Sequence, residues 1–367
     1  IDLCAKQASE TFGWHVTGEF DGQQVQSDIE VLTWSDIVQQ SRPHSVLTTY
    51  RDLIRTAWIY VSTGALFRLM LLRKGPVLAA LYPVVALIGQ AFLAVLLGWV
   101  TYNSVTLIGS EIRMPRAVQT VLAVGSALLI VAITLRWFHK HDGRFFAYYL
   151  MHDFAYSAAL LGAYPDDLEA RLRAFRQRLA AALQDEVDEV LLVGHSSGAY
   201  LGVSVLADLI RTGSLPANGP ALGFLSLGQV VPMVSFLPRA ERLRGDLRLL
   251  SASSAVTWVD VTAPGDGCCF ALCDPVAVSG QTTPEKRGPL VFSAAFTQSL
   301  SPARWKALRW RFFRLHFQYL CAFDRPKDYD YFQITAGPLT LAERYAGRAP
   351  SRSRLEKSLS KYTSVRT

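Results

Sequence analysis

Residues 194–198 read Gly-His-Ser-Ser-Gly, a G-x-S-x-G pattern centred on Ser196. A serine in this pattern acts as a nucleophile when it lies on a sharp turn between a strand and a helix, because the turn lifts its hydroxyl above the edge of the sheet. Gly194 and Gly198 would leave room for the neighbouring backbone to pack closely. The pattern alone is common, so the elements on either side decide between a nucleophile and an ordinary glycine-rich turn.

The elements on either side of the pattern favour a nucleophile. Segment 187–193 is short and ends in the apolar run VLLV, which is typical of a strand buried on both faces. Apolar residues at helical spacing follow in 199–212. We therefore predict that Ser196 lies on a strand-to-helix turn. The backbone amide of Ser197, at the start of the helix, would then donate to a developing oxyanion.

The second half of the chain alternates between strand-like and helix-like patterns. Further apolar runs of strand length occur at 222–227 and 255–261, and helical apolar spacing occurs at 165–183 and 239–250. This alternation predicts an α/β domain with a doubly wound, mostly parallel sheet.

Residues 150–336 resemble the α/β-hydrolase superfamily in this motif and its setting. The resemblance is strongest to bacterial membrane-associated lipase- or esterase-like serine hydrolases, whose catalytic half follows hydrophobic helices. It implies a sheet of the α/β-hydrolase type and a catalytic triad. In that superfamily the chain order is Ser, then Asp or Glu, then His, so both partners of Ser196 would lie downstream of it.

The acid of such a triad should follow the strand at 255–261, in the stretch WVDVTAPGDGCCF. Asp266 is the favoured residue, because a carboxylate in a loop can turn toward a histidine. Asp260 is the alternative acid, although its position within the strand also suits a structural hydrogen-bond acceptor. Asp274, before a proline, is a third and weaker choice.

The base of the triad would be His316, because it is the only histidine downstream of these acids. The alternative is a core histidine in an aromatic-rich helix, since its surroundings read RFFRLHFQYL. His195, within the motif, is expected to shape the turn without a catalytic role. His152 next to Asp153 precedes the serine and so departs from the expected chain order.

Two apolar segments in the first half predict a transmembrane helical hairpin. Residues 75–100 contain no charged residue, and neither do residues 117–135, which Arg116 and Arg136 flank. About 20 apolar residues in a helix span the hydrocarbon core of a bilayer. The alternatives are helices buried in a soluble core, or a signal peptide, which the position and length of the first segment disfavour.

Basic residues flank the outer ends of the hairpin more than its connecting loop. Five precede the first span and three follow the second, whereas the loop holds only Arg113 and Arg116. Positive charge marks the cytoplasmic side. We therefore expect a multi-pass protein with two spans, with both termini and the catalytic domain in the cytoplasm, in a bacterial inner membrane.

Composition supports a lipid bilayer as partner. Apolar residues make up 50% of the 367 residues and charged residues 18%, with a net charge of +7. The basic residues lie beside the apolar segments and in the C-terminal tail, which fits anionic headgroups better than nucleic acid. The five cysteines lack the paired spacing of a zinc or redox site, so we expect reduced thiols, no metal and no cofactor. These cysteines are Cys4, Cys268, Cys269, Cys273 and Cys321.

The sequence therefore predicts four regions. Residues 1–74 would form a cytoplasmic segment in which HVTGEF and IEVLTW are candidate edge strands of the hydrolase sheet. The hairpin would occupy 75–138 and the catalytic domain 139–336. The tail at 337–367 is rich in Ser and Arg, and we expect it to be disordered and to approach an anionic membrane surface.

Together these features predict a membrane-anchored serine hydrolase that cleaves carboxylic esters, lipid-like or amphipathic, through an acyl-enzyme on Ser196. The same triad in an acyltransferase is one alternative. A catalytically weak membrane scaffold with a hydrolase fold is another, because no His-Gly type loop precedes the motif to supply a second oxyanion donor. Losing one donor costs on the order of a hundredfold in turnover. The chain begins at Ile1 instead of Met, so we expect that either processing or truncation has removed what came first.

Overall fold

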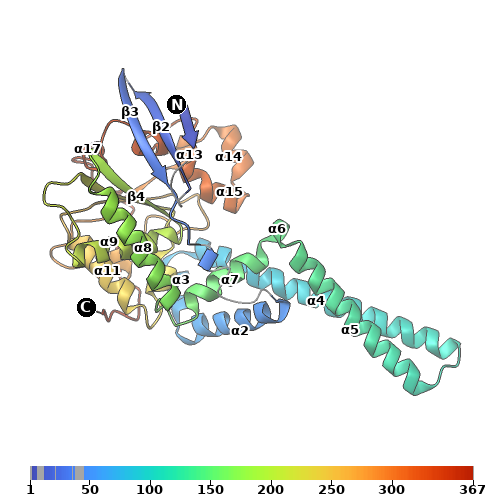
Figure 1. Cartoon of the computed structure of the whole chain (residues 1–367). Coiled ribbons are helices and arrows are strands. Elements are labelled where there is room, and N and C mark those ends of the chain that lie inside the picture. Colours follow the sequence, from blue (N-terminus) through green and yellow to red (C-terminus); the bar gives the residue numbers. More distant parts are fainter. Residues whose placement is uncertain (1, 6–11, 21, 35, 38–44, 367) are drawn as a thin grey trace. The chain divides into compact units, whose positions relative to one another are not determined.

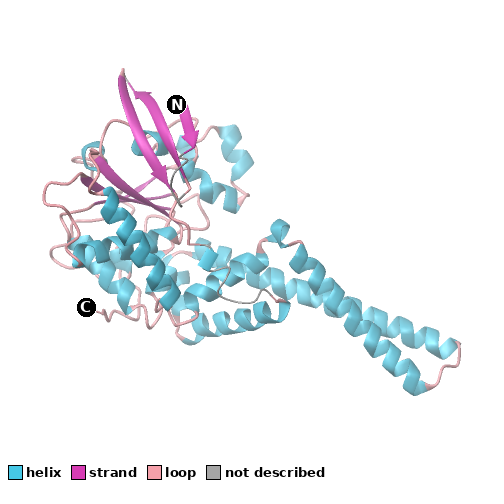
Figure 2. Cartoon of the chain, viewed as in Figure 1, coloured by secondary structure: helices cyan, strands magenta, loops and turns pink. Residues whose placement is uncertain are grey.

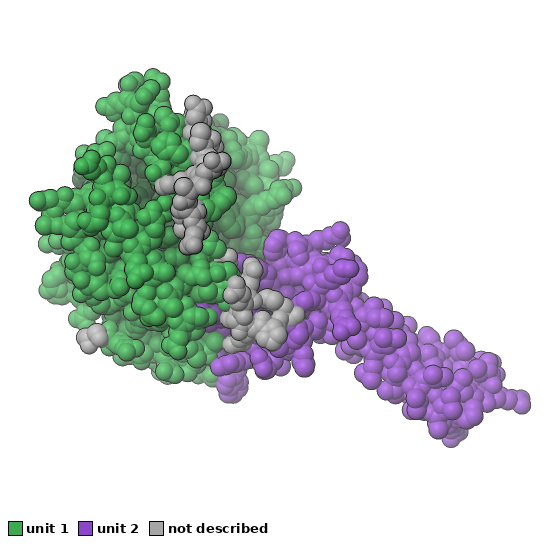
Figure 3. Space-filling model, viewed as in Figure 1, with its two compact units in different colours: residues 1–37, 60–79, 157–367 green, residues 38–59, 80–156 purple. Residues whose placement is uncertain are grey.

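The computed structural model describes residues 2–5, 12–20, 22–34, 36–37 and 45–366 (Figure 1). The chain divides into two compact units (Figure 3). The first contains residues 1–37, 60–79 and 157–367, and the second contains 38–59 and 80–156. The candidate chemistry lies entirely in the first unit.

A four-stranded parallel sheet forms the centre of the first unit (Figure 2). Its strands are β4 (Glu189–His195), β5 (Ala221–Leu227), β6 (Thr257–Thr262) and β7 (Leu290–Ser293). These strands are apolar because both faces of the sheet are covered. The structure thus confirms an α/β domain with a parallel sheet.

Alternate residues of the sheet face two different layers. Phe224 faces helix α9 (Gly198–Arg211), where a Cβ at Gly202 would lie 2.7 Å from the Phe224 ring, so the glycine permits close packing. Leu225, the next residue, belongs to a core cluster that includes Tyr319 and Tyr345 from the C-terminal part of the chain. One face is therefore covered by a crossover helix and the other by the end of the chain.

The order of the strands differs from the doubly wound arrangement that the sequence predicts. Neighbours in the sheet follow chain order, β4-β5-β6-β7, without the reversal of direction that defines a doubly wound sheet. Helices α9 and α11 (Glu241–Ala252), which connect successive strands, pack against each other. Hydrophobic periodicity identifies strands but does not specify their order, which long-range packing decides.

The predicted edge strands of the N-terminal region are also corrected. HVTGEF lies in β2 (Gly13–Phe20), but β2 pairs with β1 (Asp2–Ala5) and β3 (Gln23–Glu30) in a separate antiparallel sheet. Most of IEVLTW lies beyond β3, outside any strand. Ion pairs connect this region to helix α8 (Asp166–Ala182): Arg178 with Glu30 at 2.5 Å, and Arg171 with Asp36 at 2.6 Å.

The C-terminal tail is ordered through its described residues, 337–366, which corrects the prediction of disorder for this part of 337–367. Helix α17 (Leu341–Arg344) buries Leu341, and Leu355 forms a parallel bridge with Cys273. The fully buried guanidinium of Arg244 donates to the carbonyl oxygens of Ser364 at 2.7 Å and of Leu237 at 2.8 Å. A few buried contacts of this kind offset the entropy of a polar segment, and composition alone does not reveal them.

The remaining elements of the first unit are short helices. One of them, α3, lies in the N-terminal part of the chain, and the others follow β5. These elements are α3 (Ala65–Leu72), α10 (Val231–Ser235), α12 (Pro275–Val278), α13 (Phe296–Ser299), α14 (Pro302–Leu308), α15 (Phe312–His316), the 3-10 helix η1 (Phe317–Leu320) and α16 (Tyr331–Thr335). Of the five cysteines, the side chain of Cys4 lies outside the described residues, and the other four are free thiols.

The second unit is helical in its described residues. Its helices are the larger part of α2 (Val46–Ser62), most of α4 (Lys74–Glu111), α5 (Arg116–Lys140), α6 (Asp142–Phe145) and most of α7 (Ala147–Ala158). Helices α4 and α5 approach closely at Gly98, where a Cβ would lie 2.8 Å from Val131. The predicted helical hairpin is therefore present.

Helices α4 and α5 are long and apolar enough to cross a membrane. The most apolar 18-residue window of each has a mean hydropathy of 2.2. Only 22% of the α4 window and 6% of the α5 window is buried inside the structure. Core helices of soluble proteins are mostly buried, so this exposure argues against the soluble-core alternative.

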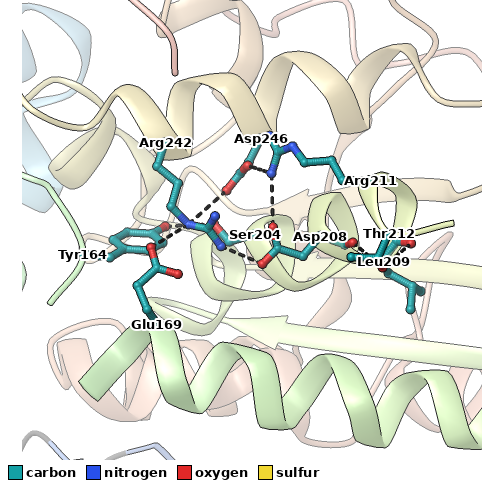
Figure 4. A network of polar contacts seen from close by, with 9 residues as sticks. All are labelled: Tyr164, Glu169, Ser204, Asp208, Leu209, Arg211, Thr212, Arg242 and Asp246. Atoms are coloured by element: carbon teal, nitrogen blue, oxygen red, sulfur yellow. Dashed lines mark hydrogen bonds and ion pairs between the residues drawn. The ribbon is translucent and has the colours of Figure 1, made fainter. Parts of the chain in front are cut away.

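A polar network joins helices α8, α9 and α11 (Figure 4). Asp246 is fully buried and lies 2.5 Å from Arg211. Arg242 lies 2.7 Å from Asp208 and 3.0 Å from Glu169. Burial raises the pKa of Asp246, and the two arginines oppose that effect. Removing one partner from such a cluster leaves a buried charge without compensation.

Replacing Asp246 should therefore destabilise the first unit. We expect Asp246→Ala to lower the free energy of unfolding of the detergent-solubilised chain by about 3 kcal/mol, measured by urea denaturation. Arg248→Ala, at an exposed position of the same helix, is the control and should change it by less than about 0.5 kcal/mol. Equal effects of the two substitutions would show that the network does not stabilise this unit.

Candidate active site

The turn at Ser196 has the backbone geometry of a nucleophile elbow. Strand β4 ends at His195, helix α9 begins at Gly198, and Ser196 between them has a φ of 55°. This left-handed conformation is strained for a residue with a side chain. A Cβ at Gly194 would lie 2.7 Å from the carbonyl oxygen of Gly198, so only glycine fits there. No atom lies near a Cβ placed at Gly198 itself, which leaves open space at the start of the helix.

The backbone amides of the turn have different roles. The Ser196 amide donates to the carbonyl oxygen of Leu227 at 2.9 Å, which ties the turn to the end of β5. Ser197 is the N-cap of α9, and its amide donates to no backbone carbonyl in the described part of the chain. An amide at the start of a helix with no partner can stabilise an anion. The geometry thus suits the oxyanion role predicted for Ser197.

Asp266 and His316, 50 residues apart in the chain, form a buried hydrogen-bonded pair. The distance from His316 Nδ1 to Asp266 Oδ2 is 2.7 Å. The Cys268 amide donates to Asp266 Oδ1 at 2.8 Å, and the Tyr319 hydroxyl donates to Asp266 Oδ2 at 3.1 Å. Burial raises the pKa of Asp266, but the hydrogen bond and charge of His316 and the Cys268 amide outweigh it and lower the pKa below its ordinary value. Asp266 is therefore a carboxylate at neutral pH.

Both Ser196 and His316 lie against the turn that follows β5. The Ser196 amide donates a hydrogen bond to the carbonyl oxygen of Leu227. A Cβ at the next residue, Gly228, would lie 3.1 Å from Cε1 of His316. His195 Nε2 donates to the carbonyl oxygen of His316 at 2.9 Å, and the two rings are 4.5 Å apart. No hydrogen bond joins Ser196 Oγ to His316 among the described residues. Such bonds are often long without substrate and shorten in the complex.

His195 is neutral at neutral pH. Burial and the neighbouring His316 lower the pKa of His195 to about 4. Its hydrogen bond to the backbone of His316 holds the end of α15 against the serine turn. This geometry fits the expectation that His195 shapes the site without exchanging protons.

The other two candidate acids point elsewhere. Asp260, in β6, accepts a hydrogen bond from Ser226 Oγ at 2.6 Å, and burial raises its pKa to about 8. Asp274 caps α12 and lies 2.5 Å from Lys286. Neither carboxyl contacts His316 in the structure, so the structure brings the favoured acid, Asp266, to the histidine.

Sequence reasoning missed three contributors to the site. Tyr319 bonds to Asp266, the Cys268 amide bonds to the same carboxyl, and Gly228 makes room for the His316 ring. Tyr319 follows His316 by three residues, a spacing that places side chains on one face of a helix, so it could have been found. The contacts of Cys268 and Gly228 depend on chain reversals that no local pattern reveals.

Asp266, Cys268 and His316 could together hold a metal ion, since their ligand atoms lie within 4.8 Å of one another. The sequence suggested no such site, because the cysteines lack the paired spacing of a zinc or redox site. Burial and the Asp266 charge raise the pKa of the Cys268 thiol to about 12. A metal would therefore have to displace the thiol proton and the Asp266–His316 hydrogen bond.

The chain matches no protein-family model, no curated protein and no solved structure with which it was compared. The resemblance to serine hydrolases therefore depends on the motif and on the geometry around Ser196.

Asp260 should make stability fall with rising pH. Its pKa is about 8 in the folded chain against an ordinary value of 3.8, so the unfolded chain loses this proton first as pH rises. Its contribution to stability therefore decreases between pH 3.8 and about 8 and is constant above that range. Asp260→Asn keeps an acceptor for Ser226 and cannot ionise.

Relative to the unsubstituted chain, Asp260→Asn should gain stability as pH rises through this window, by up to about 1.4 kcal/mol per pH unit. Urea denaturation at a series of pH values measures the difference. Asp185→Asn, at an exposed site, is the matched control and should track the unsubstituted chain. A constant difference between Asp260→Asn and the unsubstituted chain across the window would contradict the assignment.

Proposed function

We propose that this protein is a serine hydrolase that cleaves carboxylic esters through an acyl-enzyme on Ser196. The observation that carries the proposal is the strained backbone of Ser196, whose φ is 55°, on a strand-to-helix turn next to a buried Asp266–His316 pair. Strained residues of this kind persist where the surrounding structure holds them, often for function. Ser196 directly follows β4, Asp266 lies in the loop after β6, and His316 lies in α15 beyond β7, which gives the chain order Ser, Asp, His.

The proposed reaction uses His316 as base and then as acid. Its Nδ1–H donates to the Asp266 carboxylate, which leaves Nε2 as the proton acceptor. Nε2 takes the Ser196 proton as Oγ attacks the acyl carbon, and then protonates the departing alcohol. Water, deprotonated by the same nitrogen, then cleaves the acyl-enzyme, and the proton returns to Ser196 as the acid is released.

The Ser197 amide would bind the oxyanion in both tetrahedral intermediates. Among the described residues it is the one donor that the turn clearly provides. With a single donor, turnover would be lower by on the order of a hundredfold than with two. This feature favours slow hydrolysis and also keeps the second candidate function open, a membrane scaffold that retains the fold.

The substrate class follows from the apolar helices. Helices α4 and α5 support anchoring in a bilayer, which would place the hydrolase unit where lipid-like or amphipathic esters are concentrated. The basic residues outside the hairpin support a cytoplasmic location for this unit. An acyltransferase would use the same acyl-enzyme and release it to an alcohol or amine, so product analysis separates the two reactions.

The triad is tested by labelling membranes with a fluorophosphonate probe, which reacts with activated serines. We expect labelling of the unsubstituted chain and none of Ser196→Ala. Asp266→Asn should slow labelling on the order of 10⁴-fold because the histidine is no longer held in the required tautomer. Asp260→Asn is the matched control and should label normally, since Asp260 does not contact His316. Normal labelling of Ser196→Ala would reject the proposal, and a stable but unreactive protein would support the scaffold.

The orientation is tested with a membrane-impermeant maleimide on bacterial spheroplasts. Cys321, in the hydrolase unit, is exposed and should react only after the inner membrane is permeabilised. A cysteine introduced by Ile112→Cys, between α4 and α5, should react in intact spheroplasts. Cys321→Ser provides the background. Labelling of Cys321 in intact spheroplasts would reverse the proposed orientation.

A further inference from the structure

An exposed aromatic segment lies immediately before His316. The side chains of Trp310, Phe312 and Phe313 are 73%, 48% and 39% exposed, and that of Phe317 is 53% exposed. The alternative interpretation of the sequence was an aromatic-rich helix packed around the histidine, with Phe312, Phe313 and Phe317 in it, whereas the structure leaves these three rings exposed. Rings exposed together in this way mark an interaction surface.

The same segment is strongly basic. Residues 309–314 read RWRFFR, and no acidic residue occurs between 302 and 323. Lys306, Arg309, Arg311 and Arg314 are exposed, and none forms an ion pair within the described part of the chain. Arg304 is the basic residue of α14 that does form one, with Asp324 at 3.3 Å.

We propose that residues 309–314, together with Phe317, are a docking surface for an anionic phospholipid bilayer. Aromatic rings prefer the interface between water and acyl chains, and neighbouring arginines bind headgroup phosphates. The positive charge of this surface is complementary to anionic lipid, and no carboxylate of the described chain forms an ion pair with it. This surface belongs to the first unit, which also contains Ser196, Asp266 and His316.

The docking surface is continuous with the elements that hold Asp266 and His316. Phe317 directly follows His316, and the Phe312 ring lies 3.4 Å from a Cβ placed at Gly267, next to Asp266. A bilayer bound to this surface would therefore lie beside the candidate active site. A further consequence rests on the proposed function: docking would give Ser196 access to esters within the bilayer.

The test uses the full chain in nanodiscs of phosphatidylcholine, with or without about one third phosphatidylglycerol. Hydrogen exchange of a peptide covering 302–320, followed by mass spectrometry, measures docking directly. We expect slower exchange when phosphatidylglycerol is present. The triple variant Arg309→Gln/Arg311→Gln/Arg314→Gln should lose this protection. Each basic residue near an anionic surface strengthens binding roughly fivefold, so the docking equilibrium should fall on the order of a hundredfold.

A matched triple variant removes the same charge elsewhere on the hydrolase unit. Arg352→Gln/Lys357→Gln/Lys361→Gln changes exposed residues of the C-terminal tail and should keep the protection. Trp310→Ser/Phe312→Ser should also lose it. Equal protection in both lipid mixtures, or equal loss in both triple variants, would overturn the proposal. So would protection that depends on protein concentration instead of lipid charge, since this would assign the surface to a second copy of the chain.

The outcome does not depend on catalysis, because exchange reports docking even in Ser196→Ala. Labelling with a water-soluble fluorophosphonate should be the same for both triple variants, whereas hydrolysis of an ester embedded in the anionic nanodisc should fall only for the variant of 309–314. If no variant is ever labelled but the exchange pattern holds, the proposed function fails and the docking surface stands.

Discussion

The arrangement of this site depends on one strained residue, Ser196, at the end of β4. Its left-handed backbone costs on the order of 1–3 kcal/mol, and the surrounding structure holds it. The bond from the Ser196 amide to Leu227 ties the turn to β5, and the absence of a side chain at Gly194 lets α9 approach closely. The same contacts hold the start of α9, where the Ser197 amide donates to no backbone carbonyl of the described chain. If this turn relaxed, Ser196 and His316 would no longer both lie against the turn that follows β5.

Burial raises the pKa of two aspartates six residues apart, but hydrogen-bond donors reverse the net shift at only one of them. Asp266 accepts hydrogen bonds from His316, Tyr319 and the Cys268 amide, and it remains ionised although it is buried. Asp260 accepts one from Ser226, and its second oxygen has no partner, so its pKa rises to about 8. The number of donors, and not the depth of burial, decides which carboxyl carries charge. Of the two, Asp266 is the one that contacts His316.

Arginines of the first unit differ in burial and in their partners. Arg244 is fully buried and donates to backbone carbonyl oxygens, including that of Ser364 in the tail. Arg242 and Arg211 compensate buried carboxylates between helices. The arginines of 309–314 remain in solvent among exposed rings. A net charge of +7 is therefore not a uniform property of the surface. Lys306, Arg309, Arg311 and Arg314 form one stretch of the described chain without a carboxylate partner, and it lies shortly before His316.

Local pattern was sufficient for the elements and for most of the candidate site. Strand runs, helical spacing and the glycines around Ser196 depend on neighbours within a few residues, so β4, α9 and both apolar helices were predicted within a few residues of their ends, except that α4 extends about ten residues further. His316 followed from chain order. Asp266 was preferred to Asp260 because loops and strands orient carboxyls differently, and the structure agrees in bringing Asp266 to the histidine.

Tertiary structure alone decided the order of the sheet, the separate N-terminal sheet, the packing of the tail and the exposure of residues 309–314. Each of these depends on contacts between residues far apart in the chain, such as Arg244 with Ser364. A sequence pattern over a few neighbouring residues carries no information about such contacts. The RWRFFR run has the same letters whether it is buried or exposed. Whether its rings are buried depends on the space that the rest of the fold leaves for them. Here Leu315 and Tyr319 already fill the core beside this segment.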